Sequence, residues 1–224
     1  MLNIAGIPVE VRRKRIKNLH LYVKPPDGRV LVTAPLAMSD ETITQFVQTK
    51  AAWLKKHVEK YQNRPRPAAP PQYITGETLP VWGRPYRLEV RAAARYSLTL
   101  AGDTALLTAP AASTAQQRER FLREWYRALL KPEIACRLPA WEAATGLRPA
   151  AWQTKWMTTR WGTCNTKTKK LWFAVQLAQK PPECLDYVIL HEILHLKERG
   201  HNQRFYGLLD FYMAGWRERK AGLR

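Results

Sequence analysis

The sequence contains few cysteines, about half as many acidic as basic residues, and no long hydrophobic run. Its three cysteines, Cys136, Cys164 and Cys184, are odd in number and far apart, which excludes a disulfide framework and a CxxC redox pair. No stretch has the roughly 18 consecutive apolar residues of a membrane-spanning helix, so we expect no membrane partner. The first residues are apolar and the next are basic, the reverse of a secretory signal. These absences predict a reducing, cytoplasmic setting.

A surplus of positive charge dominates the composition. Lys and Arg number 37 against 18 Asp and Glu, which gives a net charge of +19. The surplus is spread over both halves of the chain, and its densest run covers residues 12–17. A basic surface favours polyanionic partners, namely nucleic acid, nucleotides or acidic surfaces. A well-solvated surface with no such partner has the same composition, so charge alone names no ligand.

The chain carries an HExxH motif that begins at His191 and ends at His195, and His201 follows it. On a helix, residues four apart share one face, so His191 and His195 can bind the same metal ion. Glu192 comes directly after the first histidine and can reach a water molecule on that ion. Imidazoles and an adjacent carboxylate are the parts of a hydrolytic zinc site, which predicts Zn²⁺ as the cofactor and Glu192 as the catalytic residue.

The residues around the motif predict a buried helix. Pro181 and Pro182 can open this helix. Residues 184–196 are apolar on most sides, so the polar side chains of the motif need strong compensation, which a metal ion provides. Gly200 suits a C-terminal cap, and we expect His201 to swing back after the turn as the third ligand.

The first 110 residues contain a weak internal repeat. A strand, a glycine-containing turn, a second strand and the tripeptide Thr-Ala-Pro occur in this order over residues 18–35 and again over residues 97–110. The turn dipeptides Asp-Gly and Gly-Asp tolerate positive φ and suit hairpins. Each copy leads into a helical segment, which predicts two hairpin–helix repeats.

The chain as a whole predicts an α+β fold in two regions. Residues 1–110 form a β-rich N-terminal region, and residues 111–224 form a compact, zincin-like α+β catalytic region, and the two can pack as one unit. The helix of the first repeat begins after Ser39, a favourable N-cap. It ends before the proline-rich residues 64–71, which predict a stiff, extended connector.

The spacing of apolar residues predicts two further helices and one further strand. A second helix is expected from about Thr114 to near Leu138, and Pro132 is expected to kink or split it. An apolar strand is expected over residues 171–177, and a last helix around residues 205–213.

Several segments together resemble a known family. They are Thr159-Arg160-Trp161-Gly162-Thr163-Cys164, Pro181-Pro182, residues 185–196, and His201-Asn202-Gln203-Arg204-Phe205-Tyr206. This combination is similar to the YgjP-like bacterial metallopeptidases and, more distantly, to SprT-like proteases. The resemblance implies a minigluzincin-like or SprT-like zinc fold, with His191, His195 and His201 as zinc ligands and Glu192 as the base.

The resemblance also implies more than one activity. The family name denotes a peptidase, so a peptide or protein is the expected substrate. One YgjP-like member is associated with nucleoside triphosphate pyrophosphatase activity, notably on UTP. The family is also found beside DNA restriction genes, which implies a DNA-associated SprT-like protease or binding module as a further alternative.

Zinc-dependent peptide hydrolysis is the leading prediction. The zinc ion makes hydroxide available near neutral pH, and Glu192 takes the proton and passes it to the leaving amine. The strand at 171–177 can be an exposed edge that pairs with an extended substrate, or an ordinary core strand. Arg160, Trp161 and Trp172 are the candidate substrate-binding residues, although a tryptophan such as Trp161 is more often a core anchor.

Two alternatives stay open. Nucleotide hydrolysis at the same metal could use Arg160, Lys167, Lys169 or Lys170 to hold phosphate, although neither a glycine-rich phosphate loop nor a carboxylate cluster for magnesium is visible. Nucleic-acid binding could use the nine tryptophans and the many cations for stacking and phosphate contacts. Packing in the core also accounts for most of these tryptophans.

Overall fold

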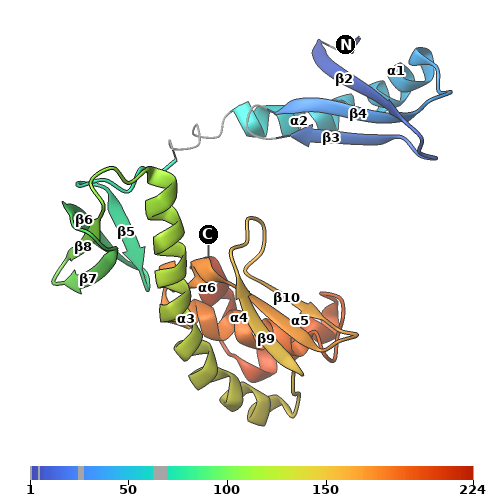
Figure 1. Cartoon of the computed structure of the whole chain (residues 1–224). Helices are drawn as coiled ribbons and strands as arrows, with labels where there is room; N and C mark the ends of the chain where they lie inside the picture. Colours follow the sequence, from blue (N-terminus) through green and yellow to red (C-terminus); the bar gives the residue numbers. More distant parts are fainter. Residues whose placement is uncertain (1, 5, 25–27, 63–69, 224) are drawn as a thin grey trace. The chain divides into compact units, whose positions relative to one another are not determined.

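The computed structural model describes residues 2–4, 6–24, 28–62 and 70–223. They form two compact units, Met1–Pro70 and Pro71–Arg224, each of which is described here by itself (Figure 1). The predicted α+β class is confirmed. The units divide at Pro70 and not at residue 110, because the second hairpin packs into the core of the second unit. Most of the predicted connector lies outside the described residues.

The first unit is a four-stranded sheet with two helices on one face (Figure 1). Its strands, in the order β1-β2-β4-β3, are β1 (Leu2–Ile4), β2 (Ile7–Lys14), β4 (Arg29–Pro35) and β3 (His20–Lys24). β2 and β4 run parallel, and the other pairs are antiparallel. The core lies between this sheet and the helices and contains Ile4, Val9, Val30, Val32, Ala34, Ile43, Val47 and Leu54.

The helices of the first unit are α1 (Asp40–Thr49) and α2 (Ala51–Gln62). The predicted N-cap is confirmed, because the Ser39 hydroxyl accepts a hydrogen bond from the backbone N–H of Thr42 at 3.2 Å. The single helix expected here is interrupted at Lys50, which leaves the helical conformation and caps α1.

The second unit begins with a sheet of the same topology. Its strands, in the order β5-β6-β8-β7, are β5 (Thr78–Val81), β6 (Arg84–Ala92), β8 (Thr104–Ala109) and β7 (Ser97–Ala101). Again the two middle strands run parallel and the outer pairs are antiparallel. The backbone N–H of Trp82, at the β5–β6 turn, donates to the carbonyl of Ala178 at 2.8 Å and ties this sheet to the segment before the motif helix.

α3 (Ala115–Thr145) follows and is longer than expected. It starts with a capping box between Thr114 and Gln117, and it ends at Gly146, whose φ of 67° is left-handed. The expected split at Pro132 is wrong, since α3 continues through this residue and through Pro139. Both prolines are exposed, so the buried face of the helix stays packed on its neighbours.

The rest of the second unit surrounds a three-stranded sheet. Its strands, in the order β10-β11-β9, are β10 (Gly162–Asn165), β11 (Lys170–Ala174) and β9 (Ala151–Lys155). The expected strand at 171–177 is therefore central and cannot be a free edge, and its last residues belong to the 3₁₀ helix η1 (Val175–Gln179). Three helices complete the unit: α4 (Pro182–Leu194), α5 (Gln203–Tyr212) and α6 (Trp216–Ala221).

Among the described residues, no helix combines the length and the apolar character that crossing a bilayer requires.

Candidate metal centre

The buried helix α4 positions the motif. Nine of its residues are buried, Glu192 among them, so the helix is fixed by packing on several sides. It ends at Leu194, with His195 as the C-cap, and the expectation that Gly200 caps it is wrong. The chain turns earlier because the N–H groups of the two residues after His195 bond back to carbonyls of the last helical turn. This tight turn brings His201 back over the helix end.

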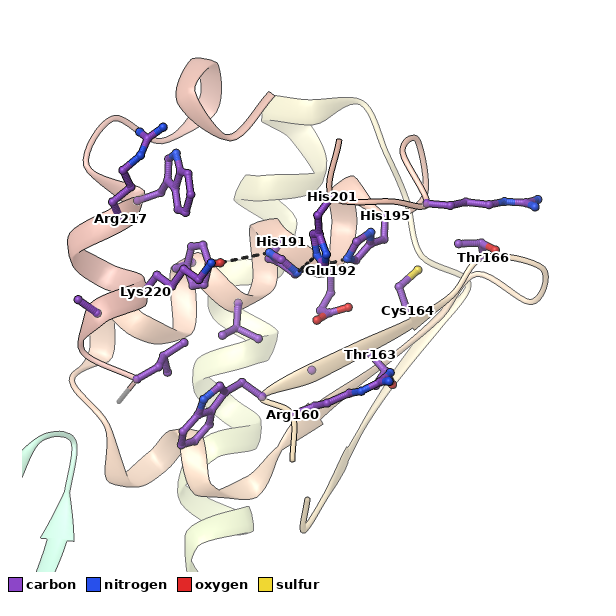
Figure 2. A pocket seen from close by; sticks show the side chains of 18 residues that line it. Arg160, Thr163, Cys164, Thr166, His191, Glu192, His195, His201, Arg217 and Lys220 are labelled. Atoms are coloured by element: carbon purple, nitrogen blue, oxygen red, sulfur yellow. Dashed lines mark hydrogen bonds between the residues drawn. The ribbon is translucent and has the colours of Figure 1, made fainter. Parts of the chain in front are cut away.

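The three imidazole rings converge on one point (Figure 2). The Nε2 atom of His191 lies 3.2 Å from that of His195 and 3.0 Å from that of His201. One ring nitrogen from each residue can be chosen so that all lie within 4.8 Å of one another. Nitrogens bound tetrahedrally to zinc at its usual distance lie about 3.3 Å apart. The residues present therefore fit a zinc ion.

The opposite ring nitrogens have partners that orient two of the rings. His195 donates from Nδ1 to the carbonyl of Glu198 at 3.0 Å, which leaves its Nε2 free of a proton. The Nδ1 atom of His191 is hydrogen-bonded to the Tyr187 hydroxyl at 3.3 Å. Such partners fix the tautomer and the direction of a metal-binding imidazole.

The ring of Phe205 packs against all three imidazole rings. Its side chain is fully buried, and its centroid lies 4.9, 4.7 and 4.8 Å from the centroids of His191, His195 and His201. The Asn202 side chain caps α5 by accepting from the Phe205 N–H at 2.9 Å, which fixes the position of the ring. Because the Phe205 ring has no hydrogen-bonding group, it packs against the imidazoles and leaves their nitrogens available to a metal ion.

The electrostatics keep His191 and His201 neutral. Burial, and then the neighbouring His195, His201 and Lys220, together lower the pKa of His191 to about 3. Burial also lowers the pKa of His201, with His195 and Lys220 acting in the same direction. Only a neutral imidazole offers a lone pair to a metal, so these shifts favour metal binding at neutral pH.

The Glu192 carboxylate lies next to the imidazoles and is 4% exposed (Figure 2). Burial raises its pKa to about 8, and the positive charge of Arg160 opposes this rise. A neighbouring divalent cation favours the ionised carboxylate, because opposite charges attract strongly in a poorly solvated site.

Glu192 packs directly on the backbone of β10. A Cβ atom added to Gly162 would lie 2.6 Å from Oε1 of Glu192 and 2.7 Å from its Cγ. Glycine is therefore required at this position for space, and not for its backbone angles.

These groups line an open cavity of about 900 Å³. Four cationic residues line it, and Glu192 is the single acidic residue among the described lining residues. The cationic residues are Arg160, Arg199, Arg217 and Lys220. The lining of the cavity thus carries more positive than negative charge.

The candidate substrate-binding residues are placed differently. Arg160 and Trp161 line the cavity, and Trp172 lines a neighbouring hollow of about 400 Å³ that shares Arg160 and Thr163 with it. The lysines expected to hold phosphate, Lys167, Lys169 and Lys170, line neither of these spaces.

Cys164 also faces the metal cavity. Burial, and then the charge of Glu192, raise the pKa of its thiol to about 11. The thiol therefore stays protonated near neutral pH and is a poor nucleophile.

Sequence reasoning missed Tyr187, Arg199, Arg217 and Lys220. Tyr187 could have been found, since it precedes His191 by one helical turn. Arg217 and Lys220 lie on α6, a short helix that the sequence did not predict.

Comparison with known proteins gives one match. No curated protein and no solved structure matches the chain. The sequence model of one family, described as YgjP-like, metallopeptidase domain, matches residues 17–224. The chain therefore belongs to the YgjP-like metallopeptidase family.

Proposed function

We propose that this metallopeptidase-family hydrolase is zinc-dependent and cleaves peptide bonds, with Glu192 as the general base. The observation that carries the proposal is the convergence of three Nε2 atoms beside a buried carboxylate on the wall of an open cavity. His191, His195 and His201 would hold the ion. When bound, zinc polarises a water molecule and lowers its pKa towards about 7.

The side chains around the ion supply the remaining steps. Glu192 accepts the proton of the attacking water and then donates it to the leaving amine. β10 is an edge strand of its sheet, and Gly162 at its start touches Glu192. An extended substrate that pairs with this edge would pass in front of the carboxylate. The cations of the cavity would favour acidic peptides.

The test combines metal analysis with hydrolysis of a casein panel. The purified protein is expected to bind one zinc per chain and to lose activity with a chelator. Glu192→Gln is expected to keep the zinc and to lose about 10²–10⁴-fold in kcat, since a positioned general base contributes this much. His195→Ala is expected to lose the zinc as well. Peptide cleavage that survives both substitutions would disprove the proposed mechanism.

Hydrolysis of nucleoside triphosphates, notably UTP, is the second candidate. The observation that favours it is the four cations of the cavity, which suit a polyphosphate at least as well as an acidic peptide. Release of pyrophosphate from UTP, with an Arg160→Ala/Lys220→Ala variant as control, distinguishes the two substrates. Pyrophosphate release without peptide cleavage would assign the site to nucleotides.

We also propose a reducing, cytoplasmic location, because none of Cys136, Cys164 and Cys184 is in a disulfide.

A further inference from the structure

The two four-stranded sheets can be compared position by position, because their strand registers agree. Thr33 pairs with His20 and Arg12 in the first sheet, as Thr108 pairs with Ser97 and Arg91 in the second. On the sheet face that points away from the core, four positions are the same in both copies: Glu10 and Glu89, Arg12 and Arg91, Leu31 and Leu106, Thr33 and Thr108. In both copies the Arg and Glu of this face form an ion pair.

Four other positions on this face differ in a consistent way. The first copy has His20, Tyr22, Lys24 and Arg29 where the second has Ser97, Thr99, Ala101 and Thr104. Because the second copy forms the same sheet with small neutral residues, the aromatic and basic side chains of the first copy are not needed to build it. We therefore expect these side chains to have a role other than forming the sheet.

The differing residues lie on an accessible edge. β3 is the last strand of its sheet, and Tyr22 is 44% exposed. The ring of Tyr22 stacks with that of His20 at 6.2 Å, and Lys24 lies 5.9 Å from its centroid. Glu10, the acidic residue of this face, is paired with Arg12 at 2.7 Å and lies 3.6 Å from Arg29, so the local charge stays positive.

Helix α2 adds a second aromatic pair at the same edge. Trp53 is 43% exposed, and its ring stacks on that of His57 at 4.1 Å. Both residues line a hollow of about 650 Å³ together with Tyr22 and Lys24. Two aromatic pairs, His20–Tyr22 and Trp53–His57, thus lie at this hollow, and the cation of Lys24 lies beside them.

We propose that this β3 surface, made of His20, Tyr22, Lys24, Arg29, Trp53 and His57, binds single-stranded nucleic acid. Unpaired bases stack on exposed aromatic rings, while Lys and Arg contact the phosphates. A duplex hides the faces of its bases, so the aromatic platforms favour a single strand. An acidic protein would use the cations, but it does not present a regular series of flat groups to the rings as the successive bases of a single strand do.

The test is fluorescence anisotropy of the full chain with a labelled 20-residue oligo(dT), with oligo(rU) as a second probe. Each variant gives a residue of the first copy its counterpart from the second. Tyr22→Thr is expected to weaken binding about tenfold, the contribution of one stacked base. Lys24→Ala/Arg29→Thr is expected to flatten the dependence of log K on log salt by about 1.4, the effect of two phosphate contacts.

The matched control is Arg87→Ala/Arg95→Ala, which removes the same charge from β6 and from the connection between β6 and β7, and is expected to change affinity less than twofold. His195→Ala is expected to bind as the unmodified chain does, because the β3 surface lies in the other unit. Four results would overturn the proposal: unchanged affinity in Tyr22→Thr, an equal loss in the control, a duplex or polyglutamate bound as tightly as oligo(dT), or loss of binding in His195→Ala.

Discussion

At the scale of single residues, Gly162 controls where the carboxylate of Glu192 can lie. In Gly162→Ala the new Cβ would lie 2.6 Å from Oε1 of Glu192, so the carboxylate has to move. We expect kcat to fall about 10²-fold, because a displacement of about 1 Å at a reacting group has this effect. Zinc binding is expected to persist, since the three atoms nearest to the added methyl group all belong to Glu192.

Gly207→Ala is the control for this variant, because a Cβ there meets no atom within 4 Å. Its kcat and zinc content are expected to equal those of the unmodified chain. Full activity of Gly162→Ala would mean that β10 moves away instead of Glu192.

The buried carboxyl of Glu192 also predicts a pH dependence of stability in the metal-free protein. Its pKa is about 8 in the folded chain, against a usual value of 4.5. The neutral form therefore stabilises the fold fully below pH 4.5, and this contribution is lost as the pH rises towards 8.

Urea unfolding with a chelator, at pH 5 and pH 8, measures this effect. Between these pH values the free energy of unfolding is expected to fall by about 2–4 kcal/mol more in the unmodified chain than in Glu192→Gln, which does not titrate. All other groups are shared, so the difference isolates Glu192. Equal pH dependence in the two proteins would contradict the raised pKa.

The sequence predicted the residues of the site that are close along the chain. The spacing of His191, Glu192 and His195 on a helix, and the nearby His201, was sufficient to expect them together. The cations Arg217 and Lys220 could not be found in this way, because tertiary packing of α6 brings them to the cavity. Trp172 lines the smaller neighbouring hollow, which shares Arg160 and Thr163 with the cavity.

At the scale of elements, α3 is a continuous helix with an exposed proline in its interior. Pro132 removes one helical hydrogen bond and crowds the preceding turn. Pro132→Ala is expected to raise the free energy of unfolding by about 1–3 kcal/mol, measured in denaturant. Lys131→Ala, its exposed neighbour, is the control and is expected to change stability by less than about 0.5 kcal/mol.

A lower stability of Pro132→Ala would show that α3 has a bend that the proline stabilises. Any loss of zinc in this variant would also contradict the expectation, because Pro132 lies away from the metal cavity.

Local signals predicted the elements well where the chain itself determines them. Ser39 caps its helix as expected, α3 begins after Thr114 as expected, and the hairpins form where glycine turns separate apolar strands. The expectations failed where tertiary packing decides. An apolar run such as 171–177 is compatible with an edge or a central strand, and only the pairing with β9 and β10 makes it central.

At the scale of the whole molecule, the two units have separate cores. The larger hydrophobic cluster contains residues from Leu79 onwards, and the smaller contains residues up to Val58. The candidate ligands and the residues of their cavity all belong to the second unit.

We therefore expect residues 71–224 to fold alone and to bind zinc within about threefold of the affinity of the full chain, as calorimetric titration would measure. The same fragment with His195→Ala is the control and is expected to lose this binding. Failure of the fragment to fold would mean that the first unit contributes to the stability of the second.

Phe205 has a consequence for any attempt to alter this centre. Its ring touches all three candidate ligands, and its own position follows from the cap at Asn202. A change in the size of that ring would tilt the three imidazoles in concert, whereas exchanging a single ligand disturbs only one of them. Redesign of this centre for a larger or smaller cation should therefore begin with Phe205, the residue that sets the common tilt of the three imidazoles.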